Sequence, residues 1–292
     1  MKRVLYFTPV IGSYAMKRFQ KESKKMGFGF KAIQYKHISL EFNKKAEFKY
    51  KGKKINFEKN DMAVLRNPKF KDSKDHVFFD ILLNHLNSLT IKTINLNLFL
   101  NLGSARDKLF QYYLLEKNNF PIIKPTYFLN SNYLLSKKLE SINSSFIVKP
   151  RSGSRGVDIF KIENEMDFIE RGKDYSASDI LIQKFVPNSF DLRIICTRKK
   201  IIGAMSRSAK EGSVVNNFSA GGSIENFGLN DKKIIKDCLE ICKLFQCDYL
   251  GIDIILTGKK YLILEVNFFC DFKGFEEATG ANFPKEIINL LK

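Results

Sequence analysis

Three side chains with oxygen ligands interrupt an otherwise apolar stretch, GIDIILTGKKYLILEVNFF, at residues 251–269. Two β-branched runs flank a Gly-containing turn, so the stretch predicts a hairpin. One strand carries Asp253, and the other carries Glu265 and Asn267. Because side chains alternate along a strand, Glu265 and Asn267 share a face, and a three-residue loop would place Asp253 directly across from Glu265.

Two carboxylates on adjacent apolar strands repel each other, and a hard cation relieves that repulsion. Carboxylate and amide oxygens are the ligands that suit Mg²⁺ shared with nucleotide phosphates. Taken alone, the pattern is equally typical of an edge hairpin whose acids face water. The rest of the chain favours the metal site.

A second candidate site is the Gly-rich loop after FIVKP, a predicted strand that ends in Lys149-Pro150. The loop holds Gly153, Ser154, Arg155 and Gly156 and leads into VDIFKI. Such a loop lets backbone N–H groups close on phosphate oxygens. It is not a Walker A loop, because GxxxxGK[ST] is absent and no helix follows, and a simple turn can have the same composition.

The composition is that of a globular protein of about two domains, with 292 residues and 44% hydrophobic content. No apolar run approaches the roughly 20 residues of a membrane span, and the N-terminus reads as a first strand rather than a signal peptide. The formal net charge of +18 favours acidic partners, although an AT-rich genome would also enrich Lys. Nucleic acid is not favoured, because no RNP or helix-turn-helix signature is present.

The five cysteines lack a CxxC pair and a nearby His, so they predict buried, reduced thiols in a cytoplasmic protein rather than a zinc site.

The periodicity of hydrophobic residues predicts the helices and strands that could position these residues. Residues 1–92 alternate strands with helices at 13–27 and 75–89, plus a basic hairpin at 44–57, which predicts a parallel sheet with function at strand ends. Arg66 ends one of these strands, where either a ligand contact or a structural role fits.

A helix is expected from Ser104, as its cap, to about Asn118. Lys108 in its first turn opposes the helix dipole unless an anion lies nearby, although a solvated lysine would look the same.

Residues 179–212 predict three strands, with Asp191 and Arg193 on one face. A Gly- and Asn-rich loop at 213–222, of the kind that covers a site, and a helix at 230–245 lead into the hairpin.

In this order the motifs resemble the ATP-grasp superfamily, and more closely RimK-type amino-acid ligases. The resemblance runs over nearly the whole chain and is best from Ser104 onward. Its motifs are ARDKL (105–109), FIVKP with its loop (146–156), QKFV (183–186), DLR (191–193), RSAKEG (207–212), NNFSAGG (216–222), GID (251–253), EVN (265–267) and FKGFEEATG (272–280).

The resemblance implies an α/β (α+β) ATP-grasp fold with ATP between two antiparallel sheets. It implies three domains: an N-terminal α/β domain (1–92), a central lid domain (93–183) and a C-terminal domain with the metals (184–292).

The resemblance also implies a role for each matched residue. Lys108 and Lys149 would neutralise phosphates, and Arg193 and Arg207 would stabilise charge on the transferred phosphoryl group. Asp253, Glu265 and Asn267 would hold two Mg²⁺ ions, with Mn²⁺ as an alternative. The remaining nucleotide contacts would come from Ser152, Gly153, Ser154, Gly156, Gln183, Lys184, Phe185, Val186, Asp191 and Asn217.

The implied activity is that of an ATP-dependent carboxylate–amine ligase. A carboxylate would form an acyl phosphate, and an amine would then displace phosphate to give an amide. Implied partners are ATP, an amino acid such as glutamate or a peptide carboxylate, and a peptide, acidic protein or small-molecule amine, in a homodimer or homotetramer.

Three departures from the family pattern concern the substrates and the nucleotide. Phe268–Asp271 replaces a small-polar-Pro-Gly turn by the acceptor site, Ser208 replaces a frequent Arg, and Lys184 replaces a common acid. The rival hypothesis is a non-catalytic ATP-binding or RNA-associated protein on the same fold.

Overall fold

The computed structural model describes residues 2–68, 73–153, 158–208 and 222–292, which form two compact units. The first unit comprises Met1–Gly103, Cys242–Leu250 and Phe268–Lys292, and the second comprises Ser104–Ile241 and Gly251–Asn267. The division into three domains expected from the sequence remains a prediction.

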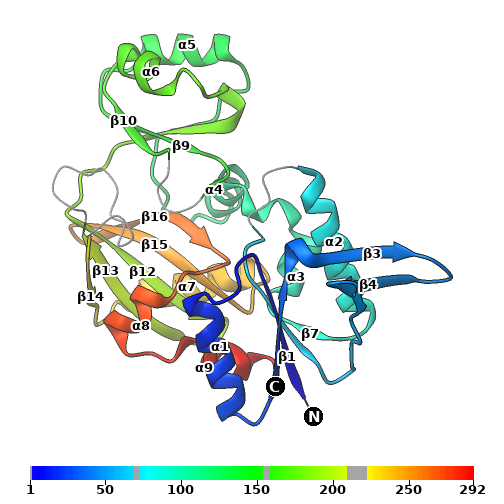
Figure 1. Ribbon diagram of the computed structural model, residues 1–292. Coiled ribbons are helices and arrows are strands. Elements are labelled where there is room, and N and C mark those ends of the chain that lie inside the picture. The colour runs from blue at the N-terminus through cyan, green and yellow to red at the C-terminus, as the bar shows by residue number, and fades with distance from the viewer. Residues whose placement is uncertain (1, 69–72, 154–157, 209–221) are drawn as a thin grey trace. The chain divides into compact units, whose positions relative to one another are not determined.

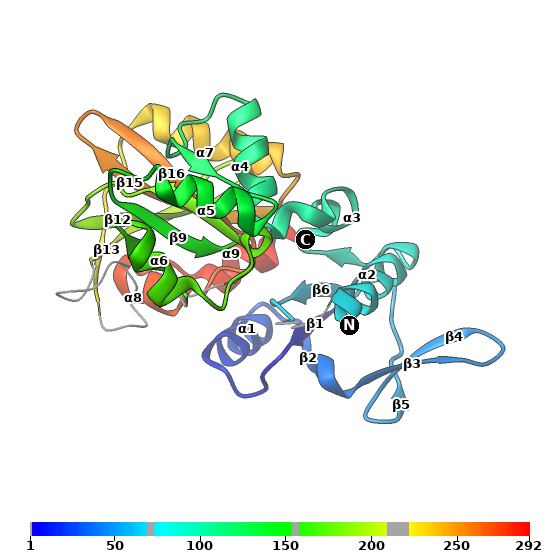
Figure 2. The ribbon, with the colours of Figure 1, turned by 90° about the horizontal axis from the view of Figure 1, so that it is seen from above.

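The first unit is built on a parallel sheet in the order β2-β1-β6-β7, as the strand–helix alternation predicts. Its core strand β1 is almost fully buried, and helices α1 and α2 lie on opposite faces of the sheet (Figures 1 and 2). The elements are β1 (Arg3–Thr8), α1 (Tyr14–Lys25), β2 (Gly29–Gln34), β6 (Met62–Leu65), α2 (Ser73–Ser88) and β7 (Lys92–Thr93).

The basic hairpin expected at 44–57 is the second half of a three-stranded antiparallel meander. Its turn at Lys51-Gly52 has positive φ at both residues and lies where the sequence predicts it. The meander consists of β3 (Ile38–Phe42), β4 (Ala46–Tyr50) and β5 (Lys53–Lys54), and η1 (Tyr35–His37) precedes it. The other helices of the first unit are α3 (Leu96–Asn101), α8 (Lys273–Thr279) and α9 (Phe283–Leu290).

Arg66 follows β6 in the first unit, and its guanidinium lies over the ring of Phe272, 5.7 Å from the centroid. A ligand contact by Arg66 remains a prediction.

The second unit contains a small antiparallel sheet in the order β10-β9-β11-β8. Helices α5 and α6, which the sequence analysis did not anticipate, lie together on one side of β9 and β10 (Figures 1 and 2). Apolar side chains such as Leu135, Val148 and Phe168 fill the space between helices and sheet. The elements are β8 (Thr126–Tyr127), α5 (Asn132–Glu140), β9 (Phe146–Pro150), β10 (Phe160–Ile162), α6 (Glu165–Gly172), η3 (Ala177–Asp179) and β11 (Ile180–Lys184).

A larger sheet in the second unit has the order β14-β13-β12-β15-β16, and its pairs β13–β14, β12–β13 and β15–β16 are antiparallel. The three strands expected at 179–212 are β11, β12 and β13. The elements are η2 (Gly103–Arg106), α4 (Lys108–Lys117), β12 (Phe190–Thr197), β13 (Ile201–Ser208), β14 (Ser223–Asn226), α7 (Lys232–Leu244), β15 (Tyr249–Thr257) and β16 (Lys260–Asn267).

Within the described ranges, none of the helices combines the length and the apolar character needed to cross a bilayer. All five cysteines are buried and unbridged, as expected.

Candidate active site

The hairpin β15–β16 places Asp253 directly across from Glu265, as predicted, but by a different route. Its loop is two residues long, because Thr257 pairs with Lys260. Ile254 pairs with Ile263 while Asp253 pairs with Glu265, so Leu264 is an extra residue that forms a β-bulge. The bulge restores the alignment that the shorter loop would have shifted by one residue.

Two arginines converge on Asp253, which is only 4% exposed and therefore does not face water. Arg193 binds it through two hydrogen bonds, from Nε to Oδ1 at 2.8 Å and from Nη2 to Oδ2 at 2.7 Å. Arg207 Nη2 lies 2.9 Å from the same Oδ2, and its Nε donates to Asp191 Oδ1 at 2.6 Å. Strands β12, β13 and β15 thus supply one buried network of two arginines and two aspartates.

Burial and the neighbouring charges together move the pKa values of the two acids in this network in opposite directions. Burial disfavours ionised Asp253, but Arg193 and Arg207 outweigh burial and hold the pKa of Asp253 below its usual range. Burial raises the pKa of Asp191 despite the charge of Arg207, and the neighbouring charge of Asp253 adds to the rise. Asp253 is therefore the persistent anion of the pair.

Helix α4 brings Lys108 to this region. Lys108 is 6% exposed, and its Nζ lies 3.5 Å from Glu265 Oε1 and 3.3 Å from the Gly153 carbonyl oxygen. A solvated lysine is therefore excluded, and Glu265 is the anion that the first turn of the helix requires.

The expected cap of α4, Ser104, is wrong. Asp107 caps the helix, accepting from Leu109 N at 2.8 Å, and also binds Arg151. Both Ser and Asp suit an N-cap, but only Asp can neutralise the arginine.

Lys149 is buried among polar groups rather than carboxylates. Its Nζ donates to Gln183 Oε1 at 2.8 Å and to Tyr112 Oη at 2.9 Å, and lies 3.5 Å from the Leu264 carbonyl oxygen. Burial lowers the pKa of Lys149 to about 8, with the charge of Glu265 opposing the shift. An incoming phosphate would stabilise the ammonium of such a desolvated lysine more than that of a lysine in water.

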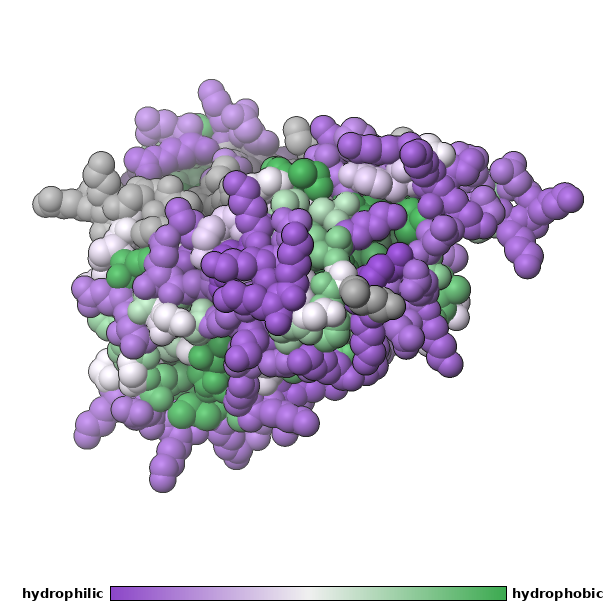
Figure 3. All heavy atoms as spheres, turned by 60° about the horizontal axis from the view of Figure 1, so that its bottom comes forward, coloured by the Kyte–Doolittle hydropathy of each residue, from purple (hydrophilic) through white to green (hydrophobic). Residues whose placement is uncertain are grey.

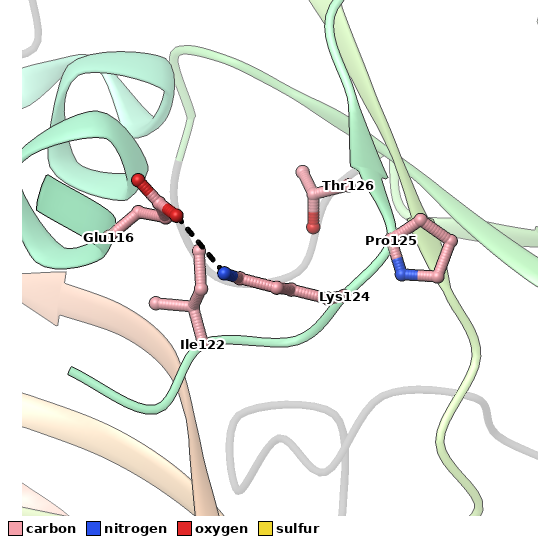
Figure 4. Close-up of a pocket in the computed structure, with 5 residues that line it drawn as sticks. All are labelled: Glu116, Ile122, Lys124, Pro125 and Thr126. Atoms are coloured by element: carbon pink, nitrogen blue, oxygen red, sulfur yellow. Dashed lines mark hydrogen bonds and ion pairs between the residues drawn. The ribbon is translucent and has the colours of Figure 1, made fainter. Parts of the chain in front are cut away.

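A hollow of about 520 Å³ adjoins this network and is lined by Glu116, Ile122, Lys124, Pro125 and Thr126 (Figure 4). None of Asp191, Asp253 and Glu265 lines it, but Gln183 Nε2 donates to Thr126 Oγ1 at 2.8 Å. Lys184 N also donates to the Pro125 carbonyl oxygen at 2.9 Å. The hollow is therefore linked through two hydrogen bonds to Gln183 and Lys184, which the sequence predicts to contact the nucleotide.

Other predicted contacts are placed only in part. Ser152 and Gly153 are exposed at the end of β9, and Lys184 is exposed at the end of β11. Phe185 and Val186 are half-buried, and Lys161 Nζ lies over the Phe185 ring at 4.9 Å. Ser154, Gly156 and Asn217, also predicted to contact the nucleotide, lie outside the described residues.

The predicted metal ligands suit a hard cation by chemistry. Asp253 and Glu265 offer carboxylate oxygens, and Asn267 donates from Nδ2 to Asp253 Oδ2 at 3.4 Å, so its amide lies beside the acids. Among the described residues, no group of three His, Cys, Asp or Glu side chains is arranged to hold a metal by itself. The donor set thus fits a cation that takes its remaining ligands from a phosphate.

Sequence reasoning missed Gln111, Tyr112, Thr126 and the Asp107–Arg151 pair. A signal was present for the first two: with Lys108, they stand at i, i+3 and i+4 of one helix and so share a face. Thr126 carries no local signal, because its partner Gln183 is far away in the sequence.

The matching family model is that of the RimK-like ATP-grasp domain, over residues 105–291. The chain belongs to the RimK-like ATP-grasp family. A relative named probable alpha-L-glutamate ligase, from Aeromonas salmonicida (strain A449), is 24% identical over 209 residues, which is 69% of each chain.

Solved structures of ATP-grasp ligases have the same fold. The ligase PsnB complexed with a minimal precursor matches at a TM-score of 0.75 and 16% identity over 99% of both chains. Another structure of PsnB also holds Mg and ADP. The macrocyclase MdnC bound with precursor peptide MdnA, from Microcystis aeruginosa MRC, matches at a TM-score of 0.69 and 16% identity over 100% of this chain and 99% of MdnC.

These findings confirm the RimK-type resemblance, the ATP-grasp fold and the predicted enzyme class, an ATP-grasp ligase that forms C–N bonds. ATP use is inherent to the ATP-grasp family.

Proposed function

We propose that this RimK-like ligase joins a carboxylate to an amine through an acyl phosphate. The observation that carries the proposal is the charge balance of the site. Among the described residues, ion pairs join Lys108, Arg193 and Arg207 to the carboxylates of Asp191, Asp253 and Glu265, and Lys149 is a fourth, buried cation whose hydrogen bonds go to neutral groups. A surplus of buried positive charge suits a polyphosphate and the anionic transition state of phosphoryl transfer.

In the first step a carboxylate oxygen of the donor attacks the γ-phosphorus of ATP. The bond from that phosphorus to the β,γ-bridging oxygen breaks, and ADP leaves with the electron pair. Lys149 and Lys108 neutralise the phosphates, while Arg193 and Arg207 stabilise charge on the transferred group.

In the second step the amine nitrogen attacks the acyl carbon of the acyl phosphate. The bond between acyl carbon and phosphate oxygen breaks, phosphate leaves, and the nitrogen loses one proton to give the amide. No histidine is required, because phosphate is already a good leaving group.

Asp253, Glu265 and Asn267 would hold two Mg²⁺ ions, with Mn²⁺ as the alternative, and the ions would neutralise phosphate charge. Arg193 and Arg207 orient Asp253 for this role. The hollow beside Lys184 and Pro125 would receive adenine, with Ile122 supplying apolar surface. Asp191 and Asn217, with the loop that contains Ser154 and Gly156, would complete the nucleotide contacts.

We further propose that the chain adds an amino acid such as glutamate to a peptide or protein. The support is the name of the Aeromonas relative and the precursor peptides bound by PsnB and MdnC. An acidic acceptor suits the net charge of +18. Figure 3 shows hydrophilic side chains around the rim and in the middle of one face, with hydrophobic patches between them.

The test is phosphate release from ATP and Mg²⁺ against a panel of amino acids, dipeptides and acidic peptides, with product masses measured. We expect release equimolar with a product whose mass is donor plus acceptor minus water. Glu265→Ala should abolish release, whereas Glu140→Ala, an exposed pair partner of Lys137, should not. Nucleotide binding without release on any pair, or release unchanged in Glu265→Ala, would contradict the proposal.

A further inference from the structure

One face of α4 holds Glu265 from three directions. Lys108 Nζ lies 3.5 Å from the Glu265 carboxylate. Gln111 Oε1 accepts from the backbone N of Val266 at 3.2 Å, and Tyr112 Oη donates to the Leu264 carbonyl oxygen at 2.7 Å. The helix thus contacts the side chain of Glu265 and the backbone on both sides of it.

These contacts act where the ladder between β15 and β16 is interrupted, directly after Ile263, whose N donates to the Pro121 carbonyl oxygen at 2.7 Å. Leu264 is the bulge residue, which has no partner across the ladder, and β16 is the last strand of its sheet. A bulge frees the backbone to re-aim the next side chain, here Glu265. Lys108, Gln111 and Tyr112 are each 4 to 6% exposed, so water cannot replace their contacts easily.

Tyr112 also reaches the lysine predicted to bind phosphate. Its Oη accepts from Lys149 Nζ at 2.9 Å while donating to Leu264. One hydroxyl therefore joins Lys149 of β9, the predicted phosphate ligand, to the bulge before Glu265 of β16, the predicted metal ligand.

We propose that Tyr112 is a positioning residue that fixes Glu265 for Mg²⁺ and couples it to Lys149, an inference that rests on the proposed role of Glu265 as a metal ligand. A purely structural role, covering the edge of β16, is the competing explanation. The two differ in whether the loss of the hydroxyl acts through Glu265.

The experiment measures ADP affinity by calorimetry across a series of MgCl₂ concentrations. Tyr112→Phe keeps the ring and removes the hydroxyl. It should raise the Mg²⁺ concentration that gives half of the maximal ADP affinity by about 10-fold, as the loss of an outer partner of a metal ligand does. Tyr113→Phe is the matched control, because its neighbouring ring is 57% exposed, and it should cause no shift.

A double-mutant cycle separates positioning from edge covering. In a Glu265→Gln background, Tyr112→Phe should shift the Mg²⁺ dependence by less than about 2-fold, because the residue it positions is already impaired. Equal shifts in both backgrounds, or none in the native background, would overturn the proposal. If Tyr112→Phe does not fold, Gln111→Leu tests the same hold on Glu265 and should give a shift of the same sign.

This readout needs neither the carboxylate nor the amine, so it fails independently of the proposed reaction. A Mg²⁺-dependent shift with no ligation product would overturn the acyl-phosphate proposal and leave the α4 contacts supported. Ligation with an unchanged Mg²⁺ dependence in Tyr112→Phe would do the reverse.

Discussion

Two arginine–carboxylate clusters, one in each unit, are built from the same groups for different ends. In the first unit Arg18 binds Glu276 through Nε at 2.8 Å and Nη2 at 2.9 Å, and Glu22 through Nη1 at 3.2 Å. Glu276 also accepts from Tyr14 Oη at 2.6 Å and from Phe283 N at 3.1 Å. This cluster joins the helices α1 and α8 and the start of α9.

The second cluster, around Asp253, differs in the charge of the shared residue and in the elements that carry the cluster. Two carboxylates share Arg18 in the first unit, whereas two arginines share Asp253 in the second. The first cluster joins helices, and the second lies on strands of one sheet beside Lys108 and Glu265. The difference teaches that a buried ion-pair network becomes a candidate site where it lies on one sheet and further charged side chains, here Lys108 and Glu265, gather beside it.

The largest expected effect is on turnover from the second cluster. Arg193→Ala should lower phosphate release by about 10³-fold, because an arginine on the transferred phosphoryl group contributes that much. Asp253 keeps Arg207, so the unfolding free energy should fall by only about 1 kcal/mol. Fixed-time phosphate assays measure the turnover, and thermal unfolding of the ligand-free protein measures the unfolding free energy. A turnover loss below tenfold would contradict the distinction between the clusters.

The first cluster should show the opposite pattern. Arg18→Met leaves Glu22 and Glu276 without their shared cation, and should cost about 2–3 kcal/mol of unfolding free energy in urea. Turnover of the folded protein should stay within about twofold. Lys25→Met is the matched control: Lys25 pairs with the same Glu22 at 3.5 Å but is 60% exposed, so its loss should cost under about 0.5 kcal/mol.

The smallest expected difference between the two regions is in how their basic groups ionise with pH. Hydrogen bonding to Glu276 raises the pKa of Arg18, so the first cluster stays charged between pH 7 and 9. Burial lowers the pKa of Lys149 to about 8, so its ammonium loses its proton as the pH rises through that value. ADP affinity should therefore fall by up to about 10-fold per pH unit above pH 8, with proton uptake on binding.

Calorimetry in two buffers of different ionisation enthalpy measures that uptake. In Lys149→Arg the guanidinium keeps its proton, so both the decline and the uptake should disappear. A decline that persists in the variant would assign the titration to another group.

The sequence predicted the elements whose signals are local. Alternation and turn residues located β15 and β16, and Asp253 met Glu265 even though the loop is shorter than expected, because the bulge at Leu264 compensates. No sequence rule distinguishes a three-residue loop from a two-residue loop plus a bulge. Helices α5 and α6, with nine and eight residues, are too short for a firm helical period.

The candidate site was predictable in its charged members and not in their partners. Lys149, Arg193 and Asp253 stand out as charges in apolar strands. Tyr112 and Gln183 lie 37 and 34 residues from Lys149, and only the fold shows that they meet. The cap of α4 was misplaced for the same reason, since the partner of Asp107 is the distant Arg151.

The acyl phosphate is the central claim, and an isotope test addresses it most directly. The donor that releases phosphate is prepared with ¹⁸O in its carboxylate and incubated with ATP, Mg²⁺ and the amine, and the phosphate is analysed by mass spectrometry. Attack on the γ-phosphorus requires that each phosphate released with amide carry one carboxylate oxygen, so we expect phosphate with one ¹⁸O atom in proportion to the product. Amide formation with unlabelled phosphate would contradict the account.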